Sequence, residues 1–202
     1  MENPPWDQRI ARILVKPLVK TPITPNQLTV VTLAVALAGA GLLAEGDAVY
    51  ADWGAGVFVL ARFMDHFDGE LARQKGMTSR LGYYLDYLSG AISYSALFLC
   101  IGLGLRDSAL GSWAIVLGGV GTGAAVLSMF LNLGIDKHLT ADAGKDAVGY
   151  PGFAGFELED GIYLLAPITW LGFLVPFFVL AGIGSAVYCL WTCWSLFRLK
   201  PR

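Results

Sequence analysis

Several long apolar runs dominate this chain of 202 residues and restrict what it can fold into. A helix needs about 20 apolar residues to cross the hydrocarbon of a bilayer, where only helices and closed barrels can pair all their backbone polar groups. Hydrophobic residues make up 55% of the chain and charged residues only 15%, whereas a soluble domain has about a quarter of its residues charged. The pattern predicts an all-α polytopic membrane protein.

We expect six transmembrane helices, at about 27–45, 51–74, 81–104, 110–134, 159–171 and 173–197. The fifth is short, because the sequence "APITWLGFLVP" interrupts the last apolar region. We interpret it as either a tilted or a half-embedded helix. Residues 27–197 would form a six-helix bundle within a single membrane domain that comprises residues 1–202.

Residues 1–22 are predicted to form an amphipathic helix in the membrane interface. The stretch "PWDQRIARILVKPLVK" carries apolar residues at helical spacing and cations on the other faces, a pattern typical of interfacial helices. Pro17 must end or kink this helix. Thr24 or Asn26 is then a plausible cap for the helix that follows.

The distribution of basic residues predicts the orientation in the membrane. With a cytoplasmic amino terminus, nearly all Lys and Arg residues fall on the cytoplasmic side, Arg106 lies on the other side and Arg62 lies within the membrane. This bias predicts that both termini are cytoplasmic, and we expect a protein of the cell inner membrane. The net charge of -2 gives no indication of nucleic-acid binding, and the sequence has no basic patch with interleaved aromatic residues. The three cysteines are not spaced as metal ligands.

The segment "DHFDGELARQKGMTSRLGYYLDYLSGA" places three acids inside two predicted spans. On a helix, Asp65 and Asp68 share one face with Gly69 and Ala72. On the next span, one stripe contains the residues Gly82, Asp86, Gly90 and Ser93. The short connection makes the two helices antiparallel neighbours, so we expect three carboxylates to converge, at the cytoplasmic end of both spans.

Three acids in a medium of low dielectric constant repel one another and require protonation or a cation. Carboxylate oxygens without His or Cys suit Mg²⁺, Mn²⁺ or Ca²⁺, and Mg²⁺ is commonly shared with substrate phosphates. The small residues Gly69, Ala72 and Gly82 would let a phosphate or nucleotide approach the backbone. The alternative is a buried network in which Arg62 and Arg73 neutralise the acids without any ligand.

The residues Asp65, Asp68, Gly69, Ala72, Arg73, Gly82 and Asp86, at their spacing, resemble the signature of the CDP-alcohol phosphotransferase (CDP-alcohol phosphatidyltransferase) family. The resemblance extends to the "TPNQLT" entry of the first span and to the six-span layout. It implies a membrane transferase, commonly a homodimer, that moves a substituted phosphate from a CDP-linked donor such as CDP-diacylglycerol to an acceptor alcohol and releases CMP. The acceptor would be a polar alcohol or a phosphorylated compound, and the pathway phospholipid or polar-lipid synthesis.

By this resemblance, Asp65, Asp68 and Asp86 would bind Mg²⁺ or Mn²⁺ on the pyrophosphate of the donor. Gly69, Ala72, Arg73 and Gly82 would belong to the nucleotide site.

The chain departs from the family pattern at Gly90, where the family has a further Asp, the expected general base. Three interpretations follow. The acceptor carries its own nucleophilic oxygen, or an acid from elsewhere acts as base, or the protein binds without catalysis. For the second, the candidates are the acids of "GFELEDGIY" at the cytoplasmic mouth of the fifth span, Glu157, Glu159 and Asp160. These acids could equally be residues of a helix start, favoured there by the helix dipole.

Two other functional classes remain open from the residues. A degenerate relative would keep the CDP and lipid pocket, lose turnover and serve a regulatory role. A transporter is the weaker alternative, because intramembrane acids suit an ion path but do not explain the spacing of the motif.

Overall fold

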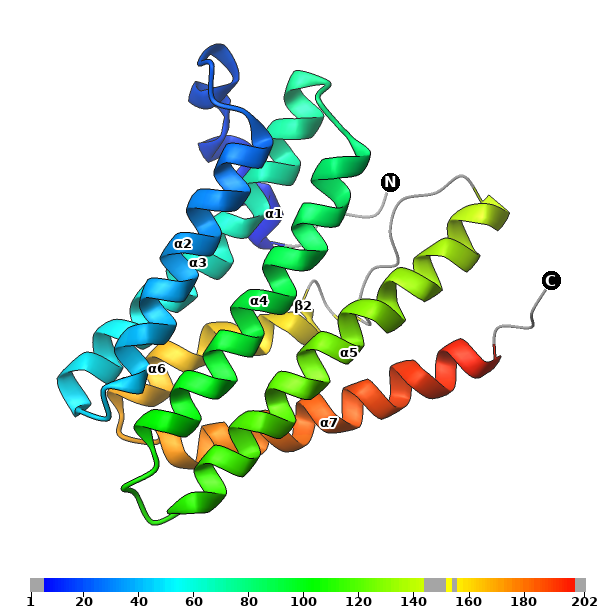
Figure 1. Cartoon of the computed structure of the whole chain (residues 1–202). Helices are drawn as coiled ribbons and strands as arrows, with labels where there is room; N and C mark the ends of the chain where they lie inside the picture. The colour runs from blue at the N-terminus through cyan, green and yellow to red at the C-terminus, as the bar shows by residue number, and fades with distance from the viewer. Residues whose placement is uncertain (1–5, 144–151, 154–155, 199–202) are drawn as a thin grey trace.

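In the computed structural model, the described residues are 6–143, 152–153 and 156–198, with side chains described for 6–136 and 160–198. The elements in chain order are α1 (Trp6–Leu14), η1 (Lys16–Lys20), α2 (Pro25–Ala44), α3 (Ala48–Lys75), α4 (Arg80–Gly104), α5 (Ser112–Ala143), β1 (Gly152–Phe153), β2 (Phe156–Glu157), η2 (Leu158–Leu164), α6 (Leu165–Trp170) and α7 (Leu174–Arg198). Apart from the two-residue strands, which pair in an antiparallel hairpin, the described chain is helical, as predicted (Figure 1).

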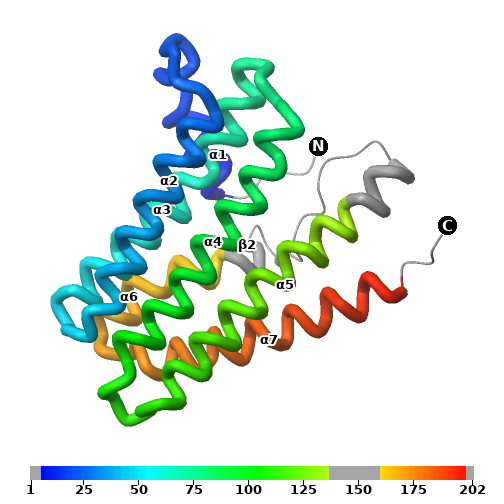
Figure 2. The backbone as a smooth tube through the Cα atoms, in the orientation of Figure 1, coloured from blue at the N-terminus to red at the C-terminus, as the bar shows by residue number. Residues whose placement is uncertain are grey.

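Long helices run side by side along the molecule (Figures 1 and 2). Helix α3 packs against α1, α2 and α6, while α4 packs against α2 and α5, and α5 packs against α7. The connections α2–α3, α4–α5 and α6–α7 lie at one end. The α3–α4 connection, helix α1 and the last turns of α7 lie toward the other (Figure 2).

Four helices are long and apolar enough to cross a membrane: α2, α4, α5 over Ser112–Asp136, and α7. Helix α3 coincides with the predicted second span, but its acidic and basic residues lower its hydropathy. The predicted fifth span is divided between the 3₁₀ helix η2 and the six-residue helix α6. At 1.5 Å per residue, α6 covers only about 9 Å, so the length of this region alone does not establish a crossing.

Local signals in the sequence explain where α2 begins. Thr24 is its N-cap, and Thr24 and Gln27 form a capping box in which each side chain accepts from the other's backbone N–H. Thr24 is therefore the cap, and Asn26 lies in the first turn. Lys75 at the end of α3 anchors the segment that precedes α2, because its Nζ donates to the carbonyl oxygens of Thr21 and Ile23, each at 2.7 Å.

Close packing of small residues holds α2 against α3. A Cβ at Gly39 would lie 2.7 Å from the backbone nitrogen of Phe58, and a Cβ at Gly54 would lie 2.7 Å from the carbonyl oxygen of Gly39. The fully buried side chains of Leu43 and Phe58 belong to the same core. This crossing brings the start of α2 beside the acidic end of α3.

Candidate active site

The first part of the candidate site is the carboxyl-terminal half of α3. Asp68 is 7% exposed and accepts hydrogen bonds from the Thr29 hydroxyl of α2 and from the Gly69 N–H, the latter at 2.6 Å. Asp65, three residues earlier, pairs with Arg62 Nη1 at 2.9 Å. The two carboxylates lie close enough to interact electrostatically. One helical turn thus holds two acids, as the spacing predicts.

The second part is the first half of α4. Ser79 caps this helix by accepting from the Gly82 N–H at 3.0 Å. A Cβ at Gly82 would lie 3.2 Å from both the Asn26 and the Ser79 side-chain oxygens, so only a small residue fits there without displacement. Asp86 follows one turn later and is exposed. The first turn of α2 therefore lies next to the first turn of α4.

The three acids differ in environment, although the sequence analysis treated them alike. Asp68 is buried, Asp65 is partly buried and Asp86 faces outward, because α3 is covered by α2 on the Asp68 side while the start of α4 is more open. Among the residues with described side chains, no group of three or more His, Cys, Asp or Glu residues is gathered closely enough to hold a metal ion. The convergence of the three acids on one ion therefore stays a prediction, and the oxygen donors are of the type that a hard divalent cation prefers.

The basic residues of the motif have different partners. Arg62 is buried, contacts Asp65 and lies with its guanidinium carbon 5.0 Å from the centre of the Tyr94 ring on α4. Arg73 pairs with Glu70 at 3.3 Å and passes over Gly69, so it neutralises neither Asp65 nor Asp68 directly. Of the two arginines in the alternative without a ligand, Arg62 pairs with an acid of the motif, Asp65, and Arg73 pairs with Glu70 instead.

Open space adjoins Gly90. A Cβ at Gly90 would meet no atom within 4 Å, and the residue is partly buried. The position at which the family carries its last Asp therefore has room for a side chain in this protein.

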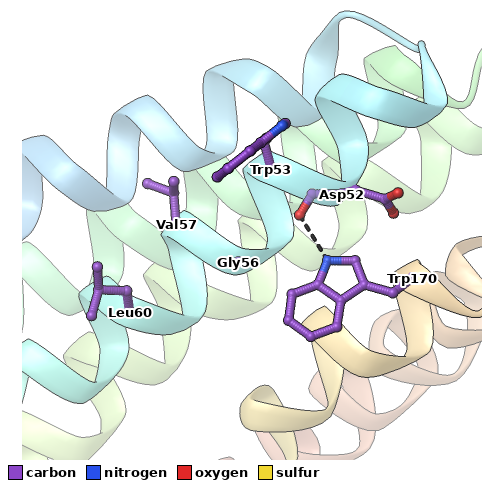
Figure 3. Close-up of a pocket in the computed structure, with 6 residues that line it drawn as sticks. All are labelled: Asp52, Trp53, Gly56, Val57, Leu60 and Trp170. Carbon is purple, nitrogen blue, oxygen red and sulfur yellow. Dashed lines mark hydrogen bonds between the residues drawn. The ribbon is translucent and has the colours of Figure 1, made fainter.

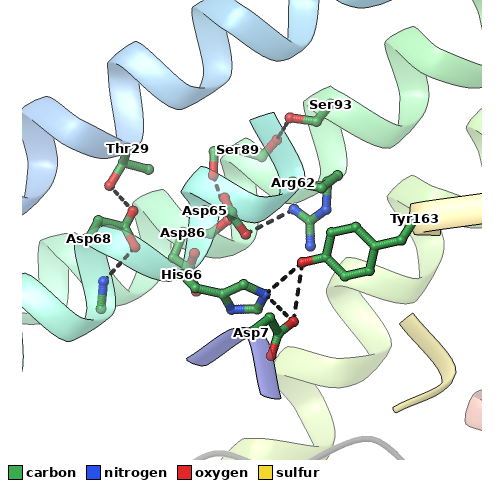
Figure 4. A network of polar contacts seen from close by, with 11 residues as sticks. Asp7, Thr29, Arg62, Asp65, His66, Asp68, Asp86, Ser89, Ser93 and Tyr163 are labelled. Carbon is green, nitrogen blue, oxygen red and sulfur yellow. Dashed lines mark hydrogen bonds and ion pairs between the residues drawn. The ribbon is translucent and has the colours of Figure 1, made fainter. Parts of the chain in front are cut away.

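Of the three candidate bases, Asp160 alone has a described side chain, while those of Glu157 and Glu159 lie outside the described residues. Asp160 lies in η2 and acts electrostatically on Tyr163 in the same element. Tyr163 in turn is within electrostatic reach of Arg62. The fold brings η2 to the Arg62 side of α3, as Figure 4 shows for Tyr163.

A network that the sequence did not suggest adjoins this cluster (Figure 4). His66 Nε2 lies 2.8 Å from Oδ2 of Asp7, a residue of α1 that is 2% exposed. The Tyr163 hydroxyl donates to the same Asp7 oxygen at 3.2 Å and lies 3.4 Å from His66 Nε2. His66 therefore contacts α1 and η2, and three distant segments meet at it.

A second buried acid was also missed. Asp136 of α5 is 2% exposed, and its Oδ2 accepts from the hydroxyls of Tyr83 at 2.8 Å and Tyr87 at 2.5 Å. A lone Asp near the polar end of an apolar run gives no signal that two tyrosines of another helix will bind it.

One hollow lies away from the carboxylate region. It has a volume of about 440 Å³ and lies between α3 and α6, where Trp170 Nε1 donates to the carbonyl oxygen of Asp52 at 3.1 Å (Figure 3). Its lining is mostly apolar, and none of the motif residues takes part. We therefore base the candidate site on the carboxylate region and not on this hollow.

Comparison with known proteins is consistent across most of the chain. Residues 22–197 match the family model described as CDP-alcohol phosphatidyltransferase. The chain is 34% identical over 105 residues to the bifunctional IPC transferase and DIPP synthase of Rubrobacter xylanophilus, an alignment that covers 50% of this chain and 23% of that protein. It is 33% identical over 81 residues to the phosphatidylinositol phosphate synthase of Streptomyces avermitilis, covering 40% of this chain and 32% of that protein.

Solved structures share the fold. The crystal structure of Mycobacterium tuberculosis phosphatidylinositol phosphate synthase with CDP-DAG bound has a TM-score of 0.73 at 18% identity, over 96% of this chain and 98% of that one. The same protein in complex with manganese and citrate has a TM-score of 0.70 at 19% identity, over 95% and 92% of the two chains.

Proposed function

This chain belongs to the CDP-alcohol phosphatidyltransferase family, and from that premise we propose that it transfers a substituted phosphate from a CDP-linked lipid donor, such as CDP-diacylglycerol, to a polar or phosphorylated acceptor alcohol. CMP is the other product, and the pathway is phospholipid synthesis. The observation that carries the proposal is the acidic turn of α3 with Asp65 and Asp68, together with Gly82 and Asp86 in the first half of α4, whose first turn lies against that of α2. Relatives named phosphatidylinositol phosphate synthase support this substrate class.

Asp65, Asp68 and Asp86 are the proposed ligands for Mg²⁺ or Mn²⁺. Their oxygen donors fit such an ion, and the structural neighbour crystallised with manganese supports the assignment. When bound, the ion would neutralise charge on the donor pyrophosphate. Asp65 holds one oxygen against Arg62 and Asp86 is exposed on α4, while the hydrogen bonds of Asp68 fix its carboxylate in place.

The nucleotide is proposed to lie over the small residues Gly69, Ala72 and Gly82. Nothing but the flexible end of Arg73 would meet a Cβ at Gly69, so the backbone there is approachable. Arg73 is exposed and its guanidinium can pair with phosphate oxygens.

The transfer requires a base. The acceptor's hydroxyl oxygen bonds to the phosphorus that carries the lipid, the bond from that phosphorus to the bridging oxygen of CMP breaks, and CMP leaves with the electron pair. The hydroxyl proton must pass to a nearby acceptor, and Gly90 has none. We assign this role to Asp160, among the three acids Glu157, Glu159 and Asp160, because it lies in the same 3₁₀ helix as Tyr163, and the Tyr163 ring lies on the Arg62 side of α3 (Figure 4).

The proposed membrane arrangement has six crossings, with η2 and α6 together as the fifth. Helix α1 lies in the cytoplasmic interface, since Ile10, Ile13 and Leu14 are exposed on a helix that also carries exposed basic residues. Both termini and the site face the cytoplasm, the membrane is the cell inner membrane, and the family resemblance favours a homodimer. Exposed apolar side chains along α7, among them Leu180, Ile183, Val187 and Leu190, suit contact with lipid tails.

Release of CMP from CDP-diacylglycerol by the purified protein tests the function. We expect turnover with Mg²⁺ or Mn²⁺ and a suitable acceptor, and its loss after chelation, restored by either ion. Asp68→Asn should lower the rate by about 100-fold or more, because a pre-positioned charge at the reacting phosphates is lost. Asp47→Asn is the matched control: it lies at the other end of α3, and Asn caps a helix as well as Asp does.

The degenerate alternative gives a different result. It would bind CDP-diacylglycerol and metal with no CMP release across a broad panel of acceptor alcohols and phosphorylated acceptors. That outcome would overturn the proposed activity.

A further inference from the structure

Asp7, His66 and Tyr163 form one hydrogen-bonded cluster from three separate segments, and no part of the proposed chemistry uses it. Both His66 Nε2 and the Tyr163 hydroxyl contact the same oxygen, Oδ2 of Asp7, at 2.8 and 3.2 Å. The side chain of Asp7 is 3% exposed, while that of His66 is 23% exposed. A carboxylate so deeply buried needs its partners, because removing them would leave an unpaired charge out of water.

Helix α1 is docked firmly at this point. Ala11 of α1 and Val15, the residue after its end, are fully buried, and Gln74 of α3 donates to the carbonyl oxygen of Arg12 at 3.0 Å. The Trp6 ring packs on the Tyr163 ring with centroids 5.3 Å apart. Helix α1 is therefore a fixed point for Tyr163, which bonds to Asp7 and packs its ring on Trp6.

Tyr163 lies in η2, so the contacts that hold its side chain also hold this 3₁₀ helix. In a 3₁₀ helix three residues make one turn, so residues i and i+3 lie on the same face. Asp160 and Tyr163 have this spacing, and the two interact electrostatically. Fixing the Tyr163 side chain on α1 and α3 therefore also fixes the face of η2 that carries Asp160.

We infer that Tyr163 is a positioning residue: held by Asp7 and His66, it keeps η2 against α3 so that Asp160 reaches the reacting hydroxyl. The inference rests on the proposed function of Asp160 as base. It assigns a task to the amino-terminal helix beyond membrane contact, since Asp7 connects that helix to the motif helix and to η2.

Tyr163→Phe is the direct test, because it removes one oxygen and keeps the ring that packs on Trp6. We expect kcat to fall by about 10-fold, the size of one lost hydrogen bond to a charged group, with the KM for CDP-diacylglycerol unchanged. Asp7→Asn should act in the same direction. Tyr188→Phe is the matched control, since the Tyr188 hydroxyl also bonds between helices, to Asn132 at 3.2 Å, but far from η2.

A double-mutant cycle with Asp160→Asn separates positioning from a general structural effect. If Tyr163 acts through Asp160, adding Tyr163→Phe to Asp160→Asn should change kcat by no more than about twofold, because coupled residues are not additive. A full and independent loss of rate in both backgrounds would overturn the inference.

Hydrogen exchange provides a readout that needs no turnover. In Tyr163→Phe the backbone amides of residues 160–164 should exchange faster than in the unmodified protein and in Tyr188→Phe, because local opening becomes easier. Unchanged exchange would overturn the inference even in an active enzyme. Faster exchange in a protein that never releases CMP would retain the anchoring of η2 and refute the transferase proposal instead.

Discussion

At position 90 a single missing side chain separates this protein from the family pattern. The residue is a glycine in the middle of α4, where the backbone geometry does not require glycine. A Cβ there would enter open space, so packing does not explain the glycine either. The substitution therefore changes the chemistry of the site more than its structure.

Gly90→Asp is predicted to rescue a protein that has lost its base. In the Asp160→Asn background, Gly90→Asp should raise the rate of CMP release by about 10-fold or more, because a positioned general base contributes at least that much. Gly90→Asn in the same background is the control of equal size without a basic oxygen, and it should remain inactive. Equal rates in the two double variants would show that position 90 cannot supply a base.

The acids of α3 and α4 also illustrate how environment differentiates residues of one type. Asp68 is held by Thr29 and the Gly69 N–H, Asp65 by Arg62, and Asp86 lies exposed on α4. Burial and neighbours, not residue type, decide how freely each carboxylate can turn toward a ligand.

Among the elements, α3 is the one on which the site depends, and its position is set by its contact with α2. The contact is close because Gly39 and Gly54 let the two backbones approach. It carries the start of α2, with Asn26 and Thr29, to the acidic end of α3 and the first turn of α4. Small residues at such crossings are a common way for membrane helices to pack.

Two substitutions two residues apart on α2 should have opposite effects on stability. Gly39→Ala places a Cβ 2.7 Å from the Phe58 nitrogen and should lower the free energy of unfolding by about 1–3 kcal/mol, because backbone atoms must shift. Gly41→Ala meets nothing within 4 Å and should raise it by up to about 1 kcal/mol through helix propensity. Unfolding in detergent, followed by circular dichroism, measures both. Destabilisation of similar size in both variants would contradict the predicted role of the α2–α3 contact.

For the whole molecule, the arrangement of helix ends agrees with the charge pattern. The α3–α4 connection, α1 and the end of α7 lie toward the same end of the bundle (Figure 2). Lys75 and Arg80 flank the first of these, and Lys16 and Lys20 lie in η1. Arg106 belongs to the α4–α5 connection at the opposite end. This arrangement is the one expected from the proposed even number of crossings with the basic end in the cytoplasm.

Cysteine labelling in cells tests this orientation. In a background with Cys100, Cys189 and Cys193 replaced, a reagent that cannot cross the membrane should label Asp107→Cys, which is exposed in the α4–α5 connection. It should label Lys20→Cys only after the cells are permeabilised. Labelling of both residues in intact cells, or the reverse pattern, would contradict a cytoplasmic site.

The sequence by itself determined the helical class, the limits of most spans and the acidic motif. These depend on local properties: hydropathy over one helix length, capping by Thr24 and Ser79, and the helical repeat that aligns Asp65 with Asp68. It did not predict that the region expected to be the fifth span is divided into η2 and α6, because a short apolar run has no unique local conformation.

Only the tertiary structure decided which partners those residues have. Thr29 on Asp68, Tyr94 over Arg62, two tyrosines on Asp136, and the meeting of Asp7, His66 and Tyr163 all join residues far apart in the chain. Such contacts arise from the way whole helices pack, and no short stretch of sequence encodes them. For the same reason the acids appeared equivalent in the sequence and became distinct only when neighbouring helices covered one of them and left another exposed.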